Sequence, residues 1–180
     1  VLHGVAIKPG KPTILGMTTR DGQVIPLVGL PGYPVSGILV LEQLIKPVIG
    51  LLTGRQAKKS VFVEATVSRR LVSSLKYLEF IRARLGNVGG KIVAVPLNRG
   101  AGVVSSFVKA DGIIHVPQNV EGYEAGEKVR VELLRPMEEI EQTLVITGSH
   151  DPLIDEAIDI MRRTWPDSFV ASSHVGSMGG

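Results

Sequence analysis

KPGKP at residues 8–12 and GLPGYPVS at residues 29–36 are the two segments that decide the fold expected for this chain. The first follows an apolar run at residues 5–7, and the second leads into a long apolar stretch. Each pattern is typical of a strand that ends in a sharp turn, because glycine and proline interrupt regular structure. In open α/β sheets, ligands bind beyond such strand ends. The two loops together therefore predict half of an anion or phosphate pocket.

Each loop has a chemical reason to attract negative charge. Lys8 and Lys11 bring two ammonium groups, and Gly10 lets the backbone approach an anion closely. The second loop ends at Ser36, the predicted N-cap of a helix, whose free N–H groups and positive dipole end favour anions. The alternatives are a solvated turn stiffened by prolines for the first loop, and a tight turn feeding a helix for the second.

The composition is that of a globular chain, and it lacks the features of a nucleic-acid-binding surface. The 180 residues are 44% hydrophobic and 21% charged, with a formal net charge of +3. Aromatic residues make up 4%, too few for a base-stacking surface, and we interpret Arg69-Arg70, Arg82 and Arg84 as a solvated strand face. The absence of cysteine excludes disulfides and thiolate metal sites. We expect a cytoplasmic protein without a signal peptide.

Residues 1–57 predict part of an α/β domain. The run Val24–Leu30 is apolar and contains β-branched residues, so we interpret it as a buried parallel strand. After Ser36 apolar residues recur at helical spacing, and Pro47 is expected to kink or end that helix. Two strands and one helix do not form a stable sheet alone, so we expect missing strands upstream and expect the chain to be a fragment.

The same helix is apolar enough to raise the question of a membrane. Its longest apolar stretch, residues 37–52, contains Glu42 and Lys46. Two charges within so short a stretch are untypical of a membrane-spanning helix. We therefore expect a core helix and no membrane partner.

Residues 58–138 predict a small antiparallel β-barrel. Five strands are expected, separated by glycine-rich turns, at residues 60–67, 77–85, 91–97, 112–116 and 127–134. The last is the clearest, because apolar and charged residues alternate along it. Residues 103–110 are ambiguous, and we favour a short helical turn there.

Residues 141–180 predict the truncated start of a second α/β domain. Leu144–Ile146 is a short expected strand, and Asp151-Pro152 is a helix start with the cap and the first-position proline in place. Apolar residues from Ile154 to Trp165 then lie on one helix face. A second strand at 169–171 completes a βαβ unit, which is followed by a loop at 172–177. The predicted fold class is thus α/β plus β.

These residues and motifs together resemble those of a known family. The order GVAIKPGKP, then GLPGxPVS and a helix, then R-G-x-G-x-x-S-S…A-D-G-I…P, resembles the C-terminal half of MoeA. That family comprises the molybdopterin molybdenumtransferases and includes the gephyrin E domain. The resemblance covers about residues 3–135, and the paired loops in this order are its specific part. The last segment resembles the periplasmic-binding-protein-like domain appended to some microbial members.

The resemblance implies an elongated cytosolic homodimer that inserts molybdate into the dithiolene of adenylylated molybdopterin and releases AMP. A divalent cation, usually Mg²⁺, assists. Lys8 takes the place of a pocket lysine, and Pro31 and Pro34 take the places of the pocket prolines. Loop neighbours implied to contact the molybdopterin-type substrate are Gly10, Lys11, Gly32, Tyr33 and Ser36. A lysine is suited to hold an oxyanion. Because the substrate's own sulfurs become the metal ligands, no side-chain nucleophile is needed, and the protein contributes positioning and electrostatic stabilisation.

In the barrel segment, Arg99, Ser105, Ser106 and Asp111 match the family pattern and are candidates for completing a partner subunit's pocket. For Asp111 the favoured alternative is a turn anchor. The four histidines lack metal-ligand spacing, and the Mg²⁺-holding carboxylates are expected upstream, so no metal ligand is assigned in this chain.

The sequence departs from the family at two positions. Tyr33 stands where an asparagine is usual, and Gly4 stands where a second pocket lysine is common. These departures keep one alternative open, a non-catalytic molybdopterin-binding or scaffold module. A further alternative rests on the C-terminal segment, as a sensor of a small ligand or oxyanion.

Overall fold

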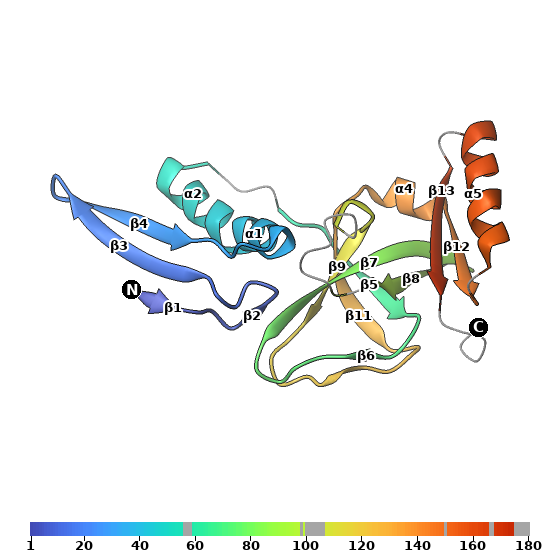
Figure 1. Ribbon diagram of the computed structural model, residues 1–180, viewed down its shortest axis with the longest axis horizontal. Coiled ribbons are helices and arrows are strands. Elements are labelled where there is room, and N and C mark those ends of the chain that lie inside the picture. Colours follow the sequence, from blue (N-terminus) through green and yellow to red (C-terminus); the bar gives the residue numbers. More distant parts are fainter. Residues whose placement is uncertain (56–58, 98, 100–106, 150, 166–167, 175–180) are drawn as a thin grey trace.

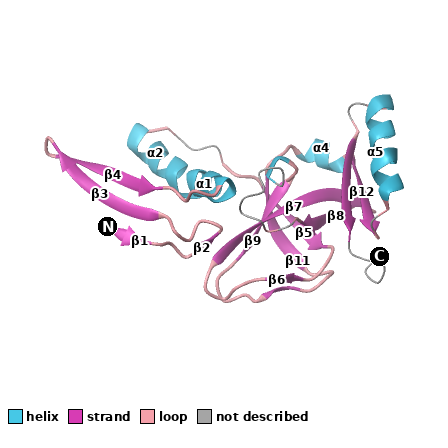
Figure 2. Ribbon diagram, viewed as in Figure 1, coloured by secondary structure: helices cyan, strands magenta, loops and turns pink. Residues whose placement is uncertain are grey.

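The structure is a computed structural model that describes residues 1–55, 59–97, 99, 107–149, 151–165 and 168–174. Three parts follow one another along the long axis (Figure 1): a hairpin with helices, a β-barrel, and a βαβ unit at the C-terminal end. Figure 2 shows that the middle part consists mainly of strands joined by loops, whereas the labelled helices lie in the two flanking parts. The candidate site lies where the first part meets the barrel.

The first part contains an antiparallel sheet in the order β1 (Leu2–His3), β3 (Ile14–Arg20) and β4 (Gln23–Gly29). The expected buried parallel strand at 24–30 is therefore wrong, because β4 pairs antiparallel with β3 and all its residues are exposed. The reason is the turn Asp21-Gly22, where both residues have positive φ, 52° and 76°. That geometry joins antiparallel strands through a two-residue loop.

A continuous helical stretch follows, made of α1 (Pro34–Val40), the π-helical turn η1 (Leu41–Ile45) and α2 (Lys46–Thr53). The N-cap is Tyr33 and not Ser36, because Pro34 with its fixed φ already begins the helix. Pro47 does not end the helix. The wider turn η1 lies directly before it and takes up the break in the ladder that a proline causes.

By length and composition alone, Pro34–Thr53 is long and apolar enough to cross a membrane. Its buried residues are confined to α1, whereas α2 has none. Lys46 pairs with Glu42 at 2.6 Å on the exposed side of the stretch. The first two turns of this helix are thus core, and its second half is surface in the described chain.

The barrel is a closed ring of five strands. The order is β7 (Leu78–Val88), β8 (Lys91–Pro96), β5 (Phe62–Val67), β11 (Lys128–Leu133) and β9 (Gly112–Val116), and β9 pairs again with β7. All five expected strands are confirmed, but the expected wholly antiparallel barrel is wrong at one seam. β5 and β8 are parallel, which is possible because β6 (Leu71–Val72) and β7 lie between them in the chain. β6 also pairs with β10 (Gly122–Tyr123) outside the ring.

Strand β7 is buried on both faces. Ile81, Ala83 and Leu85 point into the barrel core, and the alternate residues face the flanking parts of the molecule. The expected solvated face at Arg82 and Arg84 is wrong, because Arg82 is 4% exposed and the Arg84 side chain 14%. The cause is cover from outside the barrel, which strand alternation cannot reveal.

The first part is joined to the barrel by the short strand β2 (Ile7–Lys8), which pairs parallel with the start of β7. Ile7 also lies in one apolar cluster with Val35, Leu39, Phe80 and Ile113. The cluster thus contains residues from both sides of the predicted domain boundary at residue 57.

The C-terminal part is the predicted βαβ unit. β12 (Thr143–Gly148) and β13 (Phe169–His174) are parallel and are connected by α5 (Pro152–Thr164), and α4 (Met137–Glu141) precedes them. Asp151 caps α5 as predicted, accepting a hydrogen bond from the Leu153 N–H at 2.9 Å. Two expectations are wrong: Trp165 lies past the helix end and is 62% exposed, and residues 172–174 continue the strand.

Candidate anion-binding cleft

Lys8 and Arg99, two of the predicted site residues, converge on one carboxylate. Lys8 ends β2, opposite Glu79 on β7, and its Nζ lies 3.3 Å from Glu79 Oε1. Arg99 lies after β8, and its Nη1 is also 3.3 Å from Glu79 Oε1. The structure thereby brings the first loop and the barrel candidate together within one chain.

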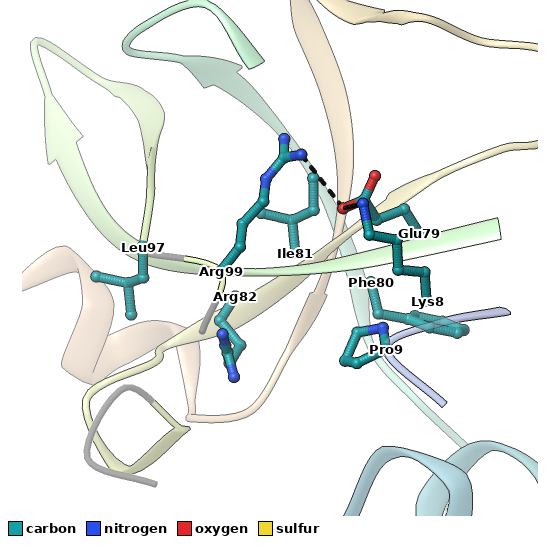
Figure 3. A pocket seen from close by; sticks show the side chains of 8 residues that line it. All are labelled: Lys8, Pro9, Glu79, Phe80, Ile81, Arg82, Leu97 and Arg99. Carbon is teal, nitrogen blue, oxygen red and sulfur yellow. Dashed lines mark ion pairs between the residues drawn. The ribbon is translucent and has the colours of Figure 1, made fainter. Parts of the chain in front are cut away.

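A cleft of about 170 Å³ lies beside this ion-pair cluster. Its lining residues come from the first loop, β7 and the chain after β8: Lys8, Pro9, Glu79, Phe80, Ile81, Arg82, Leu97 and Arg99. In Figure 3 the Arg82 side chain points away from the Glu79 carboxylate, so it does not belong to the ion-pair cluster. Burial lowers the pKa of Arg82, although a guanidinium stays charged in proteins. The cleft is therefore rich in cations.

The shape of the first loop depends on Gly10. Its φ is +125°, and a Cβ at this position would lie 2.9 Å from Val40 Cγ2 and 3.0 Å from Ile7 Cδ1. The buried Thr13 donates a hydrogen bond from Oγ1 to the Gly10 carbonyl at 2.7 Å. The loop is therefore pressed against α1, while the exposed Lys11 lies over the Tyr77 ring at 5.7 Å.

The second loop does not line this cleft. Pro31 and Ser36 are buried, and Gly32, Tyr33 and Pro34 are exposed. The first loop is close to the helix that follows the second loop, because Gly10 packs against Val40 at the end of α1. The predicted convergence of the two loops on one ligand stays a prediction.

Gly4 has φ +84°, a backbone conformation that favours glycine. A lysine is strained in that conformation. The backbone here is fixed by the Gly4 N–H bonding to the Thr13 carbonyl at 2.9 Å.

Asp111 is a structural anchor away from the cleft. Its side chain is 1% exposed and accepts from Arg84 Nε at 2.8 Å, from Arg135 Nη1 at 3.0 Å and from the Leu85 N–H at 3.0 Å. Arg84 also donates to the Val170 carbonyl, so this cluster connects the barrel to β13. Ser105 and Ser106 lie outside the described residues.

A second polar cluster was not predicted. Glu132 accepts hydrogen bonds from Ser60 Oγ and from Gln43 Nε2 at 3.1 Å, and it lies 2.8 Å from His115 Nε2. The hydrogen bond with His115, aided by those from Ser60 and Gln43, lowers the pKa of Glu132 to about 2. Ser60 bonds the carboxylate and not the imidazole, so the cluster lacks the serine–histidine contact of an activated nucleophile.

The described residues contain no group of three or more histidine, cysteine, aspartate or glutamate side chains able to hold a metal ion. Mg²⁺ therefore has no fitting donor set among the described residues.

Sequence reasoning missed Glu79, the residue on which the cluster depends. It lies within the expected strand 77–85, where a charged side chain is ordinarily exposed to solvent. Only the pairing of β2 with β7 places it under Lys8.

Comparison with known proteins agrees with this architecture. Residues 64–134 match the family model of the MoeA C-terminal region (domain IV). A molybdopterin biosynthesis protein of Methanocaldococcus jannaschii is 36% identical over 136 residues, which are 75% of this chain and 30% of that protein. Molybdopterin molybdenumtransferase of Haemophilus influenzae is 34% identical over 131 residues, covering 71% and 31%.

Solved structures give the same result. A molybdopterin biosynthesis MoeA protein from Pyrococcus horikoshii superimposes with a TM-score of 0.56 at 36% identity, over 74% of this chain and 32% of that one. A molybdenum cofactor biosynthesis protein from Pyrococcus furiosus gives 0.56 at 30% identity, over 74% and 45%. The chain spans about a third of the length of the curated relatives it matches. Residues 64–134 therefore belong to the MoeA C-terminal region (domain IV) family, and the likeness to MoeA proteins extends over about three quarters of the chain.

Proposed function

We propose that this chain is part of a molybdopterin molybdenumtransferase, which acts in molybdenum cofactor biosynthesis. The reaction is the insertion of molybdate into the dithiolene of adenylylated molybdopterin, with release of AMP. The names of the matched relatives support the enzyme class. The observation that carries the site is the pair of half-exposed cations, Lys8 and Arg99, at the cation-rich cleft.

The proposed reaction does not require a side chain of the protein to form a covalent bond with the substrate. Molybdate and the adenylyl phosphate are anions, and the substrate's own sulfurs become the metal ligands. Lys8 and Arg99 hold an oxyanion and offset the charge that develops as AMP leaves. Pro31 and Pro34 are proposed to shape the pterin side of the pocket, with Gly10, Lys11, Gly32, Tyr33 and Ser36 as neighbouring contacts.

The rest of the proposal concerns the whole protein. It is a cytoplasmic homodimer whose Mg²⁺ is held by carboxylates outside this chain. Three units are proposed: a molybdopterin-binding α/β domain that ends at residue 57, the barrel at 58–138, and the beginning of a periplasmic-binding-protein-like domain at 141–180.

The test is Lys8→Ala in the full-length protein, with molybdate-dependent AMP release from adenylylated molybdopterin as the readout. Loss of one preorganised charge at the reacting anion is expected to lower the rate about 100-fold. The matched control is Lys46→Ala, because Lys46 is an exposed lysine paired with Glu42 on the helix surface.

An unchanged rate in Lys8→Ala contradicts the site assignment. A wild-type protein that binds neither molybdopterin nor molybdate, and releases no AMP, contradicts the enzyme class.

A further inference from the structure

Glu79 is a buried carboxylate that the proposed function leaves without a role. Its side chain is 3% exposed, and strand alternation places it on the same side of β7 as the core residues Ile81 and Ala83. An ionised group in such a position is unfavourable unless it is fully partnered, and an apolar side chain of similar size serves packing at least as well. The carboxylate therefore needs an explanation other than packing.

The partners of Glu79 come from three separate segments. Oε1 is shared by Lys8 Nζ and Arg99 Nη1 at 3.3 Å each, and Oε2 accepts from Ser73 Oγ at 2.7 Å. Figure 3 shows the two cations approaching the carboxylate from either side. One buried group thus determines how far apart two cations from distant parts of the chain lie.

The two cations keep exposed surface and N–H donors that do not contact Glu79. The Lys8 side chain is 46% exposed and that of Arg99 is 41% exposed. An ammonium has three donors and a guanidinium five, so each keeps N–H groups for a ligand on the side away from Glu79. Arg99 is further held by a hydrogen bond to the Val72 carbonyl. The carboxylate of Glu79 is therefore buried, whereas the two cations that it holds are half-exposed to solvent.

We propose that Glu79 is a positioning residue, which holds Lys8 and Arg99 as a pair that grips a single tetrahedral oxyanion. The oxyanion is molybdate or the phosphate of the adenylyl group, and the inference rests on the proposed function. Lysine and arginine side chains have large rotamer freedom that a ligand must otherwise freeze. A buried anchor removes that freedom before the ligand arrives, as supporting residues do around metal ligands.

The direction in which anion affinity changes in one variant, Glu79→Gln, distinguishes a positioning role from a purely electrostatic or a purely structural one. Glu79→Gln removes a negative charge close to the ligand, so charge alone predicts tighter anion binding. A purely structural role predicts lower stability with unchanged affinity in the folded protein. Positioning predicts weaker binding although the site has become more positive.

The experiment titrates the full-length protein with molybdate in one series and AMP in the other, by calorimetry. In Glu79→Gln we expect the affinity for at least one of the two to fall about tenfold, the usual size of the effect when an outer-shell partner is lost. The anion that loses affinity identifies the occupant. Steady-state AMP release on the same variant is expected to show the loss in KM for molybdate if molybdate is that occupant, and in kcat if it is the adenylyl phosphate.

Glu64→Gln is the matched control, since it makes the same charge change at an exposed carboxylate paired with Lys128. In a Lys8→Met/Arg99→Met background, Glu79→Gln is expected to cause no further loss, because Glu79 acts through those two cations. If Glu79→Gln does not fold, Ser73→Ala loosens the same carboxylate and is expected to weaken binding in the same direction by a smaller factor.

Unchanged or tighter binding of both anions in Glu79→Gln overturns the inference, as does an equal loss in the double-Met background. Both results leave the proposed function intact as long as Lys8→Ala loses AMP release. A wild-type protein that binds neither anion and releases no AMP overturns both proposals.

Discussion

Glu132 shows how a single side chain makes the molecule sensitive to acid. It joins η1, through Gln43, to the barrel residues Ser60 and His115, and His115 lies edge-on to Phe62 and Phe80. Its pKa of about 2 in the folded protein is well below its ordinary value of 4.5. The folded state therefore favours the ionised carboxylate.

Because the pKa is depressed on folding, the stabilisation is complete above pH 4.5 and is lost as the pH falls towards 2. The shift corresponds to about 3 kcal/mol of unfolding free energy. We expect urea unfolding at pH 6, 4 and 3 to show this loss in the wild type, with a flatter profile in Glu132→Gln. Glu141→Gln, at an exposed position, is the control and is expected to follow the wild type. Parallel profiles for wild type and Glu132→Gln contradict the prediction.

At the residue scale the sequence identifies some anchors and misses others for a physical reason. Asp111 was predicted as a turn anchor because aspartate before glycine is a turn signal, but its side chain bonds to Arg84, Leu85 and Arg135, which are far from it in the chain. Glu132 alternates with Val131 and Leu133, and that pattern places it on the outward face of β11. Only the arrival of η1 and Ser60 over that face, from distant parts of the chain, buries it.

At the scale of elements, the clearest miss had a usable signal. The dipeptide Asp21-Gly22 is a strong indicator of a two-residue hairpin, and it predicts antiparallel strands on both sides. The long apolar run after it instead suggested a buried parallel strand. The hairpin exposes Met17, Val24 and Leu27 at 76%, 63% and 52%, so its apolar content is not evidence of burial in this chain.

The βαβ unit is docked on the barrel through a glycine. A Cβ on Gly86 of β7 would lie 2.0 Å from Val145 Cγ2 and 3.3 Å from the Thr143 carbonyl oxygen. We expect Gly86→Ala to push β12 away from β7 and to speed hydrogen exchange of the β12 and β13 amides, while the amides of β5 and β11 keep their protection.

Gly148→Ala is the control for this substitution, because Gly148 lies in β12 with open space where its Cβ would be. Equal exchange in the two variants, at wild-type rates, shows that the close approach of Val145 to Gly86 does not determine the docking.

At the scale of the whole molecule, the first part and the barrel share a core. Phe80 is 5% exposed and lies in the cluster with Ile7, Val35 and Leu39. We expect Phe80→Ala to lower the unfolding free energy by about 3–5 kcal/mol. Native-state hydrogen exchange is expected to show α1 opening before the barrel, whereas both open together in the wild type.

Val61→Ala is the comparison, since Val61 is 59% exposed and contributes little to the core. A variant Phe80→Ala that unfolds in one step with wild-type stability contradicts a shared core.

The order of the three parts was predictable, and their junctions were not. Strand alternation, turns and the capped start of α5 are local signals, so the five barrel strands and the βαβ unit follow from the sequence. The junctions depend on β2 pairing with β7 and on Gly86 meeting Val145, contacts between residues far apart in the chain. The candidate site was half predicted for the same reason: Lys8 and Arg99 have motif signals, and Glu79 has none.

Strand β7 carries all of these junctions on a single run of eleven residues, from the cleft at Glu79 to the docking glycine at Gly86. Adding or deleting one residue within it would invert every side chain beyond that point, because inward and outward positions alternate. Such a change would disrupt three contacts of β7 together: the cleft at Glu79, the ion pair of Arg84 with Asp111, and the docking of the βαβ unit at Gly86. A point substitution along β7 therefore affects the one contact at its site, whereas a change in the length of β7 affects all of them.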